Sequence, residues 1–134
     1  MPVELVVVTP EGEAFSGPVE EVVLPGVEGE FGVLEAHERF LSALDHGCME
    51  IRTLEGSHFS FVSDGFAEVG PERVVVMVDR HVPQHEIDVA AARSAQENAS
   101  AELERIGAAD DPNKVELEKA LARANAELDV ADRG

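Results

Sequence analysis

The fold is decided by residues 49–62, which read Met-Glu-Ile-Arg-Thr-Leu-Glu-Gly-Ser-His-Phe-Ser-Phe-Val. In the first part, apolar or small side chains alternate with the charged Glu50 and Arg52, which is the period of a strand with one buried face. Residues 55–57 supply a short loop, and residues 58–62 return with two phenylalanines on one face. The stretch therefore predicts two neighbouring strands joined by a tight connection.

The same pattern continues on both sides of this stretch, from the N-terminus to Pro83. Short apolar runs are separated by turn signals that contain Pro, Gly or Asp. The runs are Val3–Val8, Val19–Leu24, Phe66–Val69 and Val74–Val78. The last of these is an uninterrupted aliphatic run and is typical of a buried strand. Many short strands at regular turn spacing favour a β-sandwich or barrel over residues 1–83.

The composition changes after Pro83. Alanine occurs four times in residues 1–83 and 13 times in residues 84–134. Asp88 is an expected N-cap for a helix that ends at Gly107, and Asp111 is expected to cap a second helix with Pro112 at its first position. The helical stripes are Val89, Ala92, Ala95, Ala99, Leu103 and Ile106, then Leu117, Leu121, Ala124, Leu128 and Ala131. We predict an α+β protein, in which a helical hairpin over residues 84–134 follows the sandwich.

Much of each helical stripe is alanine. A buried alanine stabilises far less than the roughly 1.5–3 kcal/mol of a buried leucine or valine. We therefore infer a weakly held hairpin that another surface can displace.

The bulk properties exclude several classes of partner. The net charge of −18 disfavours direct binding to nucleic acid or to anionic lipid. One cysteine excludes an intramolecular disulfide, which fits a reducing compartment. The N-terminus lacks the pattern of a signal peptide, and no apolar run approaches the ~18 residues of a membrane span. We expect a soluble protein whose association with a membrane comes through a partner.

No motif for catalysis or metal binding stands out. The three glycines of residues 26–32 lack the spacing of a phosphate-binding loop, so this stretch is a tight acidic turn or an exposed contact loop. His81 and His85 are four residues apart, but Pro83 lies between them and would break the helix that a metal pair needs. His46 and Cys48 alone make a weak metal pair, and Cys48, which opens a half-buried strand, is expected to be inert. We predict no catalytic residue and no metal site.

The whole chain resembles the epsilon subunits of F-type ATP synthases of the bacterial type. The most specific part is residues 25–34, Pro-Gly-Val-Glu-Gly-Glu-Phe-Gly-Val-Leu, followed by Ala36-His37. Residues 5–12, 63–69 and 74–79 also match, in the same order. The family architecture is a sandwich followed by a helical hairpin.

The resemblance implies a non-catalytic rotor subunit of the central stalk that helps to couple ion-driven rotation to ATP synthesis. Its expected partners are the gamma subunit, the c-subunit ring and, when the hairpin is extended, the catalytic alpha/beta head, where extension inhibits ATP hydrolysis. Glu28, Gly29, Glu30 and Phe31 match the loop that faces the c-ring, and His37 falls in the gamma-facing region. The expected location is peripheral, on the cytoplasmic face of the inner membrane.

Some family members bind ATP through a motif at the start of the first helix. Here the site would involve Ile87, Asp88, Arg93 and Arg123. Because the motif's arginine position holds Ala91, and Glu127 stands where a basic group would help, we expect weak ATP binding or none. No other cofactor is expected.

Two other readings are open at this point. A free-standing β-sandwich adapter would share the fold without needing the 28–31 loop. An enzyme would need a catalytic constellation, and no such constellation is visible in the sequence.

Overall fold

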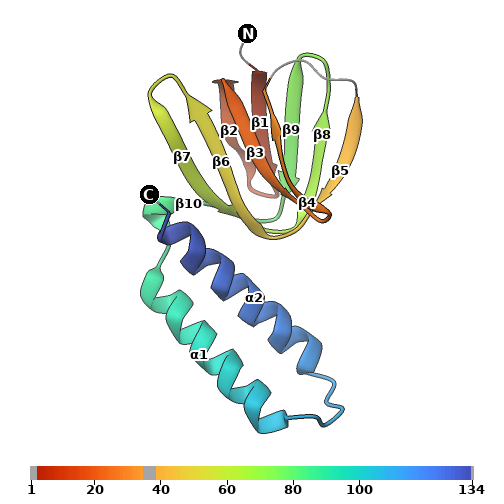
Figure 1. Ribbon diagram of the computed structural model, residues 1–134, viewed down its shortest axis with the longest axis vertical. Helices are drawn as coiled ribbons and strands as arrows, with labels where there is room; N and C mark the ends of the chain where they lie inside the picture. Colours follow the sequence, from red (N-terminus) through yellow and green to blue (C-terminus); the bar gives the residue numbers. More distant parts are fainter. Residues whose placement is uncertain (1–2, 35–38, 134) are drawn as a thin grey trace.

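The computed structural model describes residues 3–34 and 39–133. Ten strands form one continuous sheet with the order β10-β7-β6-β3-β5-β8-β9-β1-β2, and β4 pairs with β3 off this path. The sheet curls over to make a two-layered sandwich (Figure 1). The strands are β1 (Val3–Thr9), β2 (Gly12–Val19), β3 (Glu21–Gly26), β4 (Gly29–Val33), β5 (Phe40–Leu44), β6 (Gly47–Thr53), β7 (Gly56–Val62), β8 (Gly65–Val69), β9 (Arg73–Val78) and β10 (His81–Pro83).

The sandwich core is filled by one side of each strand. Leu5, Val7, Val74 and Val76 are each 0% exposed, and they alternate with more exposed neighbours along β1 and β9. β1 and β9 form the parallel pair of the sheet, with Leu5 opposite Val74. Strand alternation thus gives each of these strands one buried face and one outer face.

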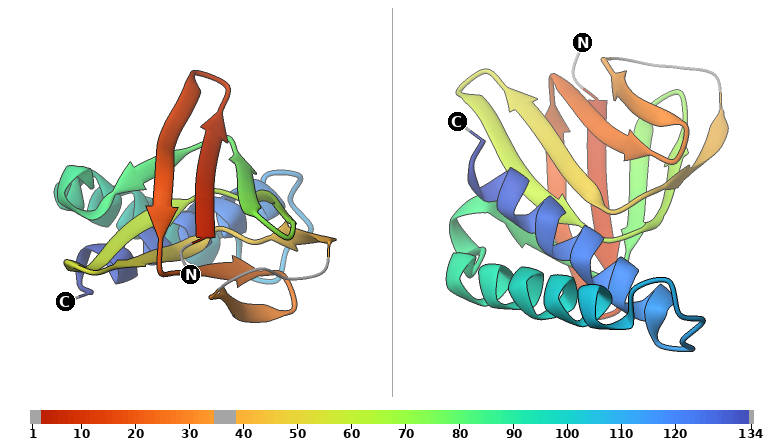
Figure 2. Two further views of the ribbon diagram at one scale, coloured as in Figure 1. Left: turned by 90° about the horizontal axis from the view of Figure 1, so that it is seen from above. Right: turned by 60° about the horizontal axis from the view of Figure 1, so that its bottom comes forward.

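The helical hairpin joins the sandwich at one end. It consists of α1 (Val89–Ile106) and α2 (Lys114–Ala131), preceded by a short 3₁₀ turn at Gln84–Glu86. α2 packs on β6 and β7, whereas the main contact of α1 is α2 (Figure 1). The right view of Figure 2 shows the helices lying along the bottom of the sandwich, with the C-terminal end of α2 nearest the strands. The predicted α+β class, a sandwich followed by a helical hairpin, is therefore confirmed.

Four strands were not predicted from the sequence. β2, β4, β5 and β10 fall where we expected turns or no regular structure. The predicted strand Val19–Leu24 spans the end of β2 and most of β3, because the chain changes direction at Glu20. The stretch 26–32 is not one tight turn, since only residues 27–28 form a turn and Gly29 begins β4.

The prediction for α1 holds and that for the start of α2 is wrong. Asp88 Oδ1 accepts a hydrogen bond from the Ala91 backbone N–H at 3.0 Å, and Gly107 ends the helix with φ +61°. Asp111 instead accepts from the Asn113 N–H at 2.7 Å, so it closes a turn before α2 begins at Lys114. Asp111 lies two residues before the N-cap Asn113, so its side-chain hydrogen bond stays within the preceding turn.

The apolar stripe of α1 is also narrower than predicted. Val89 and Ala95 are exposed, whereas Ala92 and Ala99 are buried. Gln96, which the stripe omitted, is half-buried and donates to Asn125 Oδ1 at 2.7 Å. A polar pair therefore stands where α1 was expected to present only small side chains. Within residues 3–34 and 39–133, neither helix has the length and hydropathy that a membrane crossing requires.

Candidate interaction surfaces

The tip of the β3–β4 hairpin carries four residues predicted to contact a partner. Glu28, Gly29 and Glu30 are exposed, and Phe31 is half-buried. The Phe31 ring meets Phe40 edge-on, with 6.0 Å between the ring centroids. Such a contact fixes the root of the hairpin while leaving both carboxylates in solvent.

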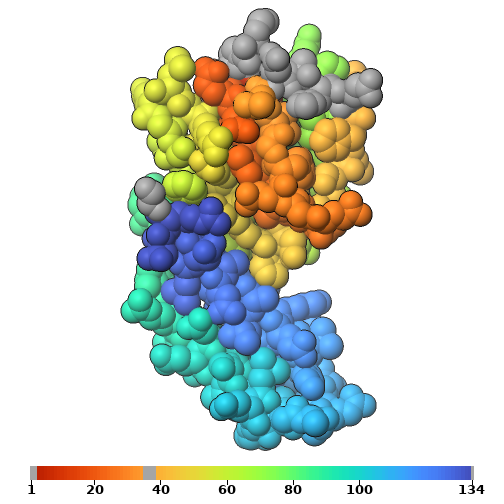
Figure 3. All heavy atoms as spheres, viewed as in Figure 1, coloured from red at the N-terminus to blue at the C-terminus, as the bar shows by residue number. Residues whose placement is uncertain are grey.

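Backbone bonds also tie this hairpin to the rest of the sheet. The Val27 N–H donates to the Ala43 carbonyl at 3.0 Å, and the Asp45 N–H donates to the Pro25 carbonyl at 2.8 Å. Gly29 has φ +133°, which L-side chains rarely adopt. The tip therefore presents its two acidic groups from a fixed position at the margin of the domain (Figure 3).

A second surface is apolar and was missed by the sequence analysis. On β1, β9, β8 and β5, the residues that alternate with the core point away from it. We call them the outer apolar face: Val6, Val8, Leu41, Ala43, Phe66, Val75 and Met77. Leu41, Phe66 and Met77 are 64%, 51% and 39% exposed.

The strand register makes one row of this face continuous, whereas Glu68 lies between Leu41 and Val75 in the neighbouring row. Val8 lies opposite Met77, Met77 opposite Phe66, and Phe66 opposite Ala43. A sheet that is apolar on both faces is usually covered on both. A contiguous exposed apolar patch of this kind marks a site of protein–protein contact.

The sequence held a signal for this face. Residues 74–78 are apolar at every position, so both faces of β9 are apolar and not only the core face. The unbroken run alone predicts a buried strand. In the structure Val75 and Met77 instead reach the surface. A hollow of about 990 Å³, lined partly by Arg39, Leu41 and Val75, borders the face.

His37, the residue predicted to face the gamma subunit, lies outside the described residues. Its assignment is neither supported nor opposed by the geometry.

A third surface joins the hairpin to the sandwich. Cys48, Phe61 and Val130 form a small buried cluster, with Phe59, Val82, Ile87 and Ala126 packed around it. The cluster is separate from the main core. Only the C-terminal part of α2 contributes to it, through Ala126 and Val130.

Polar contacts surround the cluster. Arg80 pairs with Glu127 at 3.1 Å, and its guanidinium lies 5.7 Å from the centre of the Phe61 ring. Gln84 Nε2 donates to the Val130 carbonyl at 2.9 Å and to the Arg133 carbonyl. We call Arg80 and Gln84 the latch, because each reaches from the sandwich side to the end of α2.

Of the four residues predicted to bind ATP, two make other contacts and two are exposed. Ile87 packs in the buried cluster, and Asp88 is occupied as the cap of α1. Arg93 and Arg123 are exposed on different helices, and within the described residues neither makes an ion pair. Within the described part of the chain, no hydrogen bond or ion pair joins these four side chains.

Burial shifts the pKa of two titratable groups, Cys48 and His81. Burial raises the pKa of the Cys48 thiol, so the thiol stays protonated and unreactive. His81 is half-buried, and burial lowers its pKa. In the part of the chain that the structure describes, no three metal-ligating side chains gather in one place.

Known proteins match this sequence along most of its length. The family model described as "ATP synthase, Delta/Epsilon chain, beta-sandwich domain" matches residues 2–84. The ATP synthase epsilon chain of Desulfosudis oleivorans is 46% identical over 101 residues, 75% of this chain and 76% of that protein. That of Anaeromyxobacter sp. (strain K) is 39% identical, over 99% of this chain and 100% of the relative.

Solved structures match as well. A chain in the Euglena gracilis mitochondrial ATP synthase, from a structure of its OSCP, F1 and c-ring, superposes with a TM-score of 0.82 and 26% identity. That match covers 93% of this chain and 78% of the other. A chain in the central stalk and c-ring of Tetrahymena thermophila mitochondrial ATP synthase gives a TM-score of 0.66 at 15% identity, over 98% and 97% of the two chains, and so shows the fold alone.

Proposed function

This chain belongs to the delta/epsilon family of ATP synthase chains, and we propose that it binds the gamma subunit through its outer apolar face. As an epsilon chain it is a non-catalytic subunit of the complex, and we assign it to the central stalk. The observation that carries the proposal is the exposure of Leu41, Phe66 and Met77 on one face of the sheet. An apolar partner surface would bury these side chains and supply most of the affinity.

We assign the acidic tip of the β3–β4 hairpin to the c-ring. The exposed carboxylates of Glu28 and Glu30 fit basic or polar loops on a partner, and the Phe31–Phe40 contact gives the tip the rigidity needed to transmit rotation. His37 remains assigned to the gamma side. The chain is then peripheral to a membrane through the ring, on the cytoplasmic face of the inner membrane.

We divide the chain into a binding domain, residues 1–83, and a regulatory hairpin, residues 84–134. The hairpin is held by one small cluster and the latch, so it can exchange this contact for one with gamma and the alpha/beta head. The extended form is proposed to inhibit ATP hydrolysis. Weak ATP binding or none is expected, since Asp88 is occupied and Arg93 and Arg123 lie on separate helices.

Binding to gamma is tested with a purified alpha–beta–gamma head complex and the full-length chain. Phe66→Asp places a charge in the centre of the outer apolar face and should weaken binding by about 100-fold or more, as expected for a desolvated aromatic anchor. Leu54→Asp is the matched control, because Leu54 is 91% exposed on the β6–β7 turn and far from that face in the strand order. Equal affinities for both variants would reject the assignment of the face.

Coupling and inhibition need separate measurements. Glu30→Lys reverses the charge of the tip and should reduce ion-driven ATP synthesis in the reconstituted complex, while binding to gamma stays unchanged. Truncation after Ile87 keeps β10 on the sheet and Ile87 in the cluster, and it should raise ATP hydrolysis if the hairpin inhibits. A chain that binds neither gamma nor the ring would instead be a free-standing adapter.

A further inference from the structure

An open groove lies between the two free ends of the curled sheet. β2 and β10 are the two ends of the strand order, and residues from β2, β6, β7 and β10 line the space between them. Its volume is about 700 Å³, which is within the range of small-molecule sites. The groove is distinct from the outer apolar face and from the β3–β4 tip.

The floor of the groove contains an unsatisfied hydroxyl. Ser60 is 4% exposed, and its Oγ is the buried side-chain polar atom without a hydrogen-bond partner among residues 3–34 and 39–133. Alternation along β7 puts Ser60 on the same side as the core residue Val62, away from the helices. Buried hydroxyls are normally bonded, and Ser60 lines the groove, so a rotation of its side chain can bring this hydroxyl to a bound polar group.

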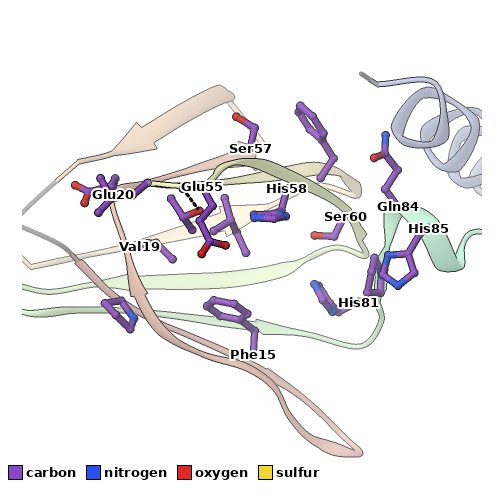
Figure 4. Close-up of a pocket in the computed structure, with 16 residues that line it drawn as sticks. Phe15, Val19, Glu20, Glu55, Ser57, His58, Ser60, His81, Gln84 and His85 are labelled. Carbon is purple, nitrogen blue, oxygen red and sulfur yellow. Dashed lines mark hydrogen bonds between the residues drawn. The ribbon is translucent and has the colours of Figure 1, made fainter.

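The two ends of the groove differ in chemistry. Figure 4 shows Glu20 and Glu55 toward one end, and Ser60 and His81 toward the other. Because burial lowers the pKa of His81, its imidazole is neutral near pH 7 and offers no positive charge to an anion. The carboxylates at the opposite end, on a chain of net charge −18, attract cations instead.

Between these ends the lining is mainly apolar. Phe15, Val19 and Ile51 come from β2 and β6, and Phe15 and Ile51 also pack on the sandwich core. A flat apolar body would lie against these side chains. A carboxylic acid of the same shape would face Glu20 and Glu55 with a like charge.

We propose that this groove binds a small amphipathic amine. The apolar body contacts Phe15, Val19 and Ile51, the ammonium group lies toward Glu20 and Glu55, and a hydroxyl or other polar atom bonds Ser60. Gln84 lines the groove and also bonds the last turn of α2, so the occupant lies against the segment that joins the two domains.

The test uses tyramine, which carries a hydroxyl, an aromatic ring and an ammonium group, and the isotope-labelled full-length chain. Amide resonances of β2, β6 and β7 should shift on titration. Replacing tyramine with 3-(4-hydroxyphenyl)propionate, which has the same ring and an acid in place of the amine, should weaken binding about tenfold or more.

Two variants separate the contributions of the groove. Ser60→Ala should weaken tyramine binding by about fivefold, the value of one hydrogen bond, and it should fold well because it removes an unpaired hydroxyl. Glu55→Gln should weaken it by about two- to fivefold. Glu72→Gln is the control, since Glu72 lines the hollow beside the outer apolar face. Equal binding of the acid, unchanged binding by Ser60→Ala, or shifts confined to residues outside the groove would each overturn the proposal.

Discussion

Detachment of the hairpin can be measured at Cys48, because Val130 covers it. Val130 is 0% exposed and Cys48 is 8% exposed in the same buried cluster. Val130→Ala removes two methyl groups, at about 0.8 kcal/mol each for lost burial plus a smaller amount for the cavity. The substitution therefore destabilises the docked state of the hairpin by about 2 kcal/mol relative to the detached state. The detached fraction should therefore rise about 30-fold.

The assay is the rate at which a thiol reagent modifies the isolated full-length chain. Cys48 is the single cysteine, so one kinetic phase reports one site. Burial raises the pKa of this thiol in the docked state, and reaction therefore proceeds through the detached state. Under native conditions the rate should rise about 30-fold for Val130→Ala. Gln84→Ala, which breaks the latch without opening a hole beside the thiol, should give a smaller rise.

Val115→Ala is the matched control, because Val115 is 60% exposed on the first turn of α2. It should leave the rate unchanged. An equal rate for the wild-type chain and Val130→Ala would refute the inference that α2 gates Cys48. A urea dependence as steep as that of global unfolding would also refute it, since release of the hairpin exposes much less surface.

Other predictions concern stability and are checked by urea unfolding. Gly65→Ala should destabilise the sandwich by about 3 kcal/mol or more, because its Cβ would lie 2.1 Å from the Met77 carbonyl oxygen. Asp88→Ala should cost about 1 kcal/mol through loss of the α1 cap, and a result near zero would show that the cap is dispensable. The free energy of unfolding should fall as the pH drops from 7.5 to 5.5, and His81→Gln should make this fall smaller. Burial lowers the pKa of His81, so its contribution is complete above the unfolded pKa of about 6.5 and is lost as the pH falls through the folded value. An unchanged pH profile would exclude this role.

The elements that the sequence predicts well are those whose pattern is set by burial on one face. β6 alternates because Met49 and Ile51 meet the core, β7 because its two phenylalanines meet the cluster under the hairpin, and α1 is bounded by Asp88 and Gly107. β2 escapes prediction because it is an edge strand, exposed along most of its length, and carries Gly17 and Pro18. A strand needs apolar alternation only where one of its faces is buried, and little of either face of β2 is buried.

The surfaces also differ in how far the sequence predicts them. A motif predicts the 28–31 loop as a contact site, and the unbroken apolar run in β9 could have revealed the outer apolar face. The latch could not be predicted, because Arg80 and Glu127 are 47 residues apart and their contact depends on how the hairpin lies. The groove is equally hidden, since Ser60 on β7 and Phe15 on β2 meet only when the sheet curls.

The separation of the two buried clusters explains how the hairpin could detach from the sandwich while both parts stay folded. The sandwich core contains no residue of α1 or α2, and Gln96, Ala99 and Ala124 lie in the helix–helix contact and not in the cluster on β6 and β7. Release therefore exposes Val130, Ala126 and their few neighbours, and breaks an Arg80 pair whose guanidinium is already half-exposed. Such pairs contribute at most about 1 kcal/mol, so the total cost is a few kcal/mol. A partner surface that buries one or two aliphatic side chains of the hairpin offsets this cost. The hairpin can therefore occupy two positions, one docked on the sandwich and one bound to a partner.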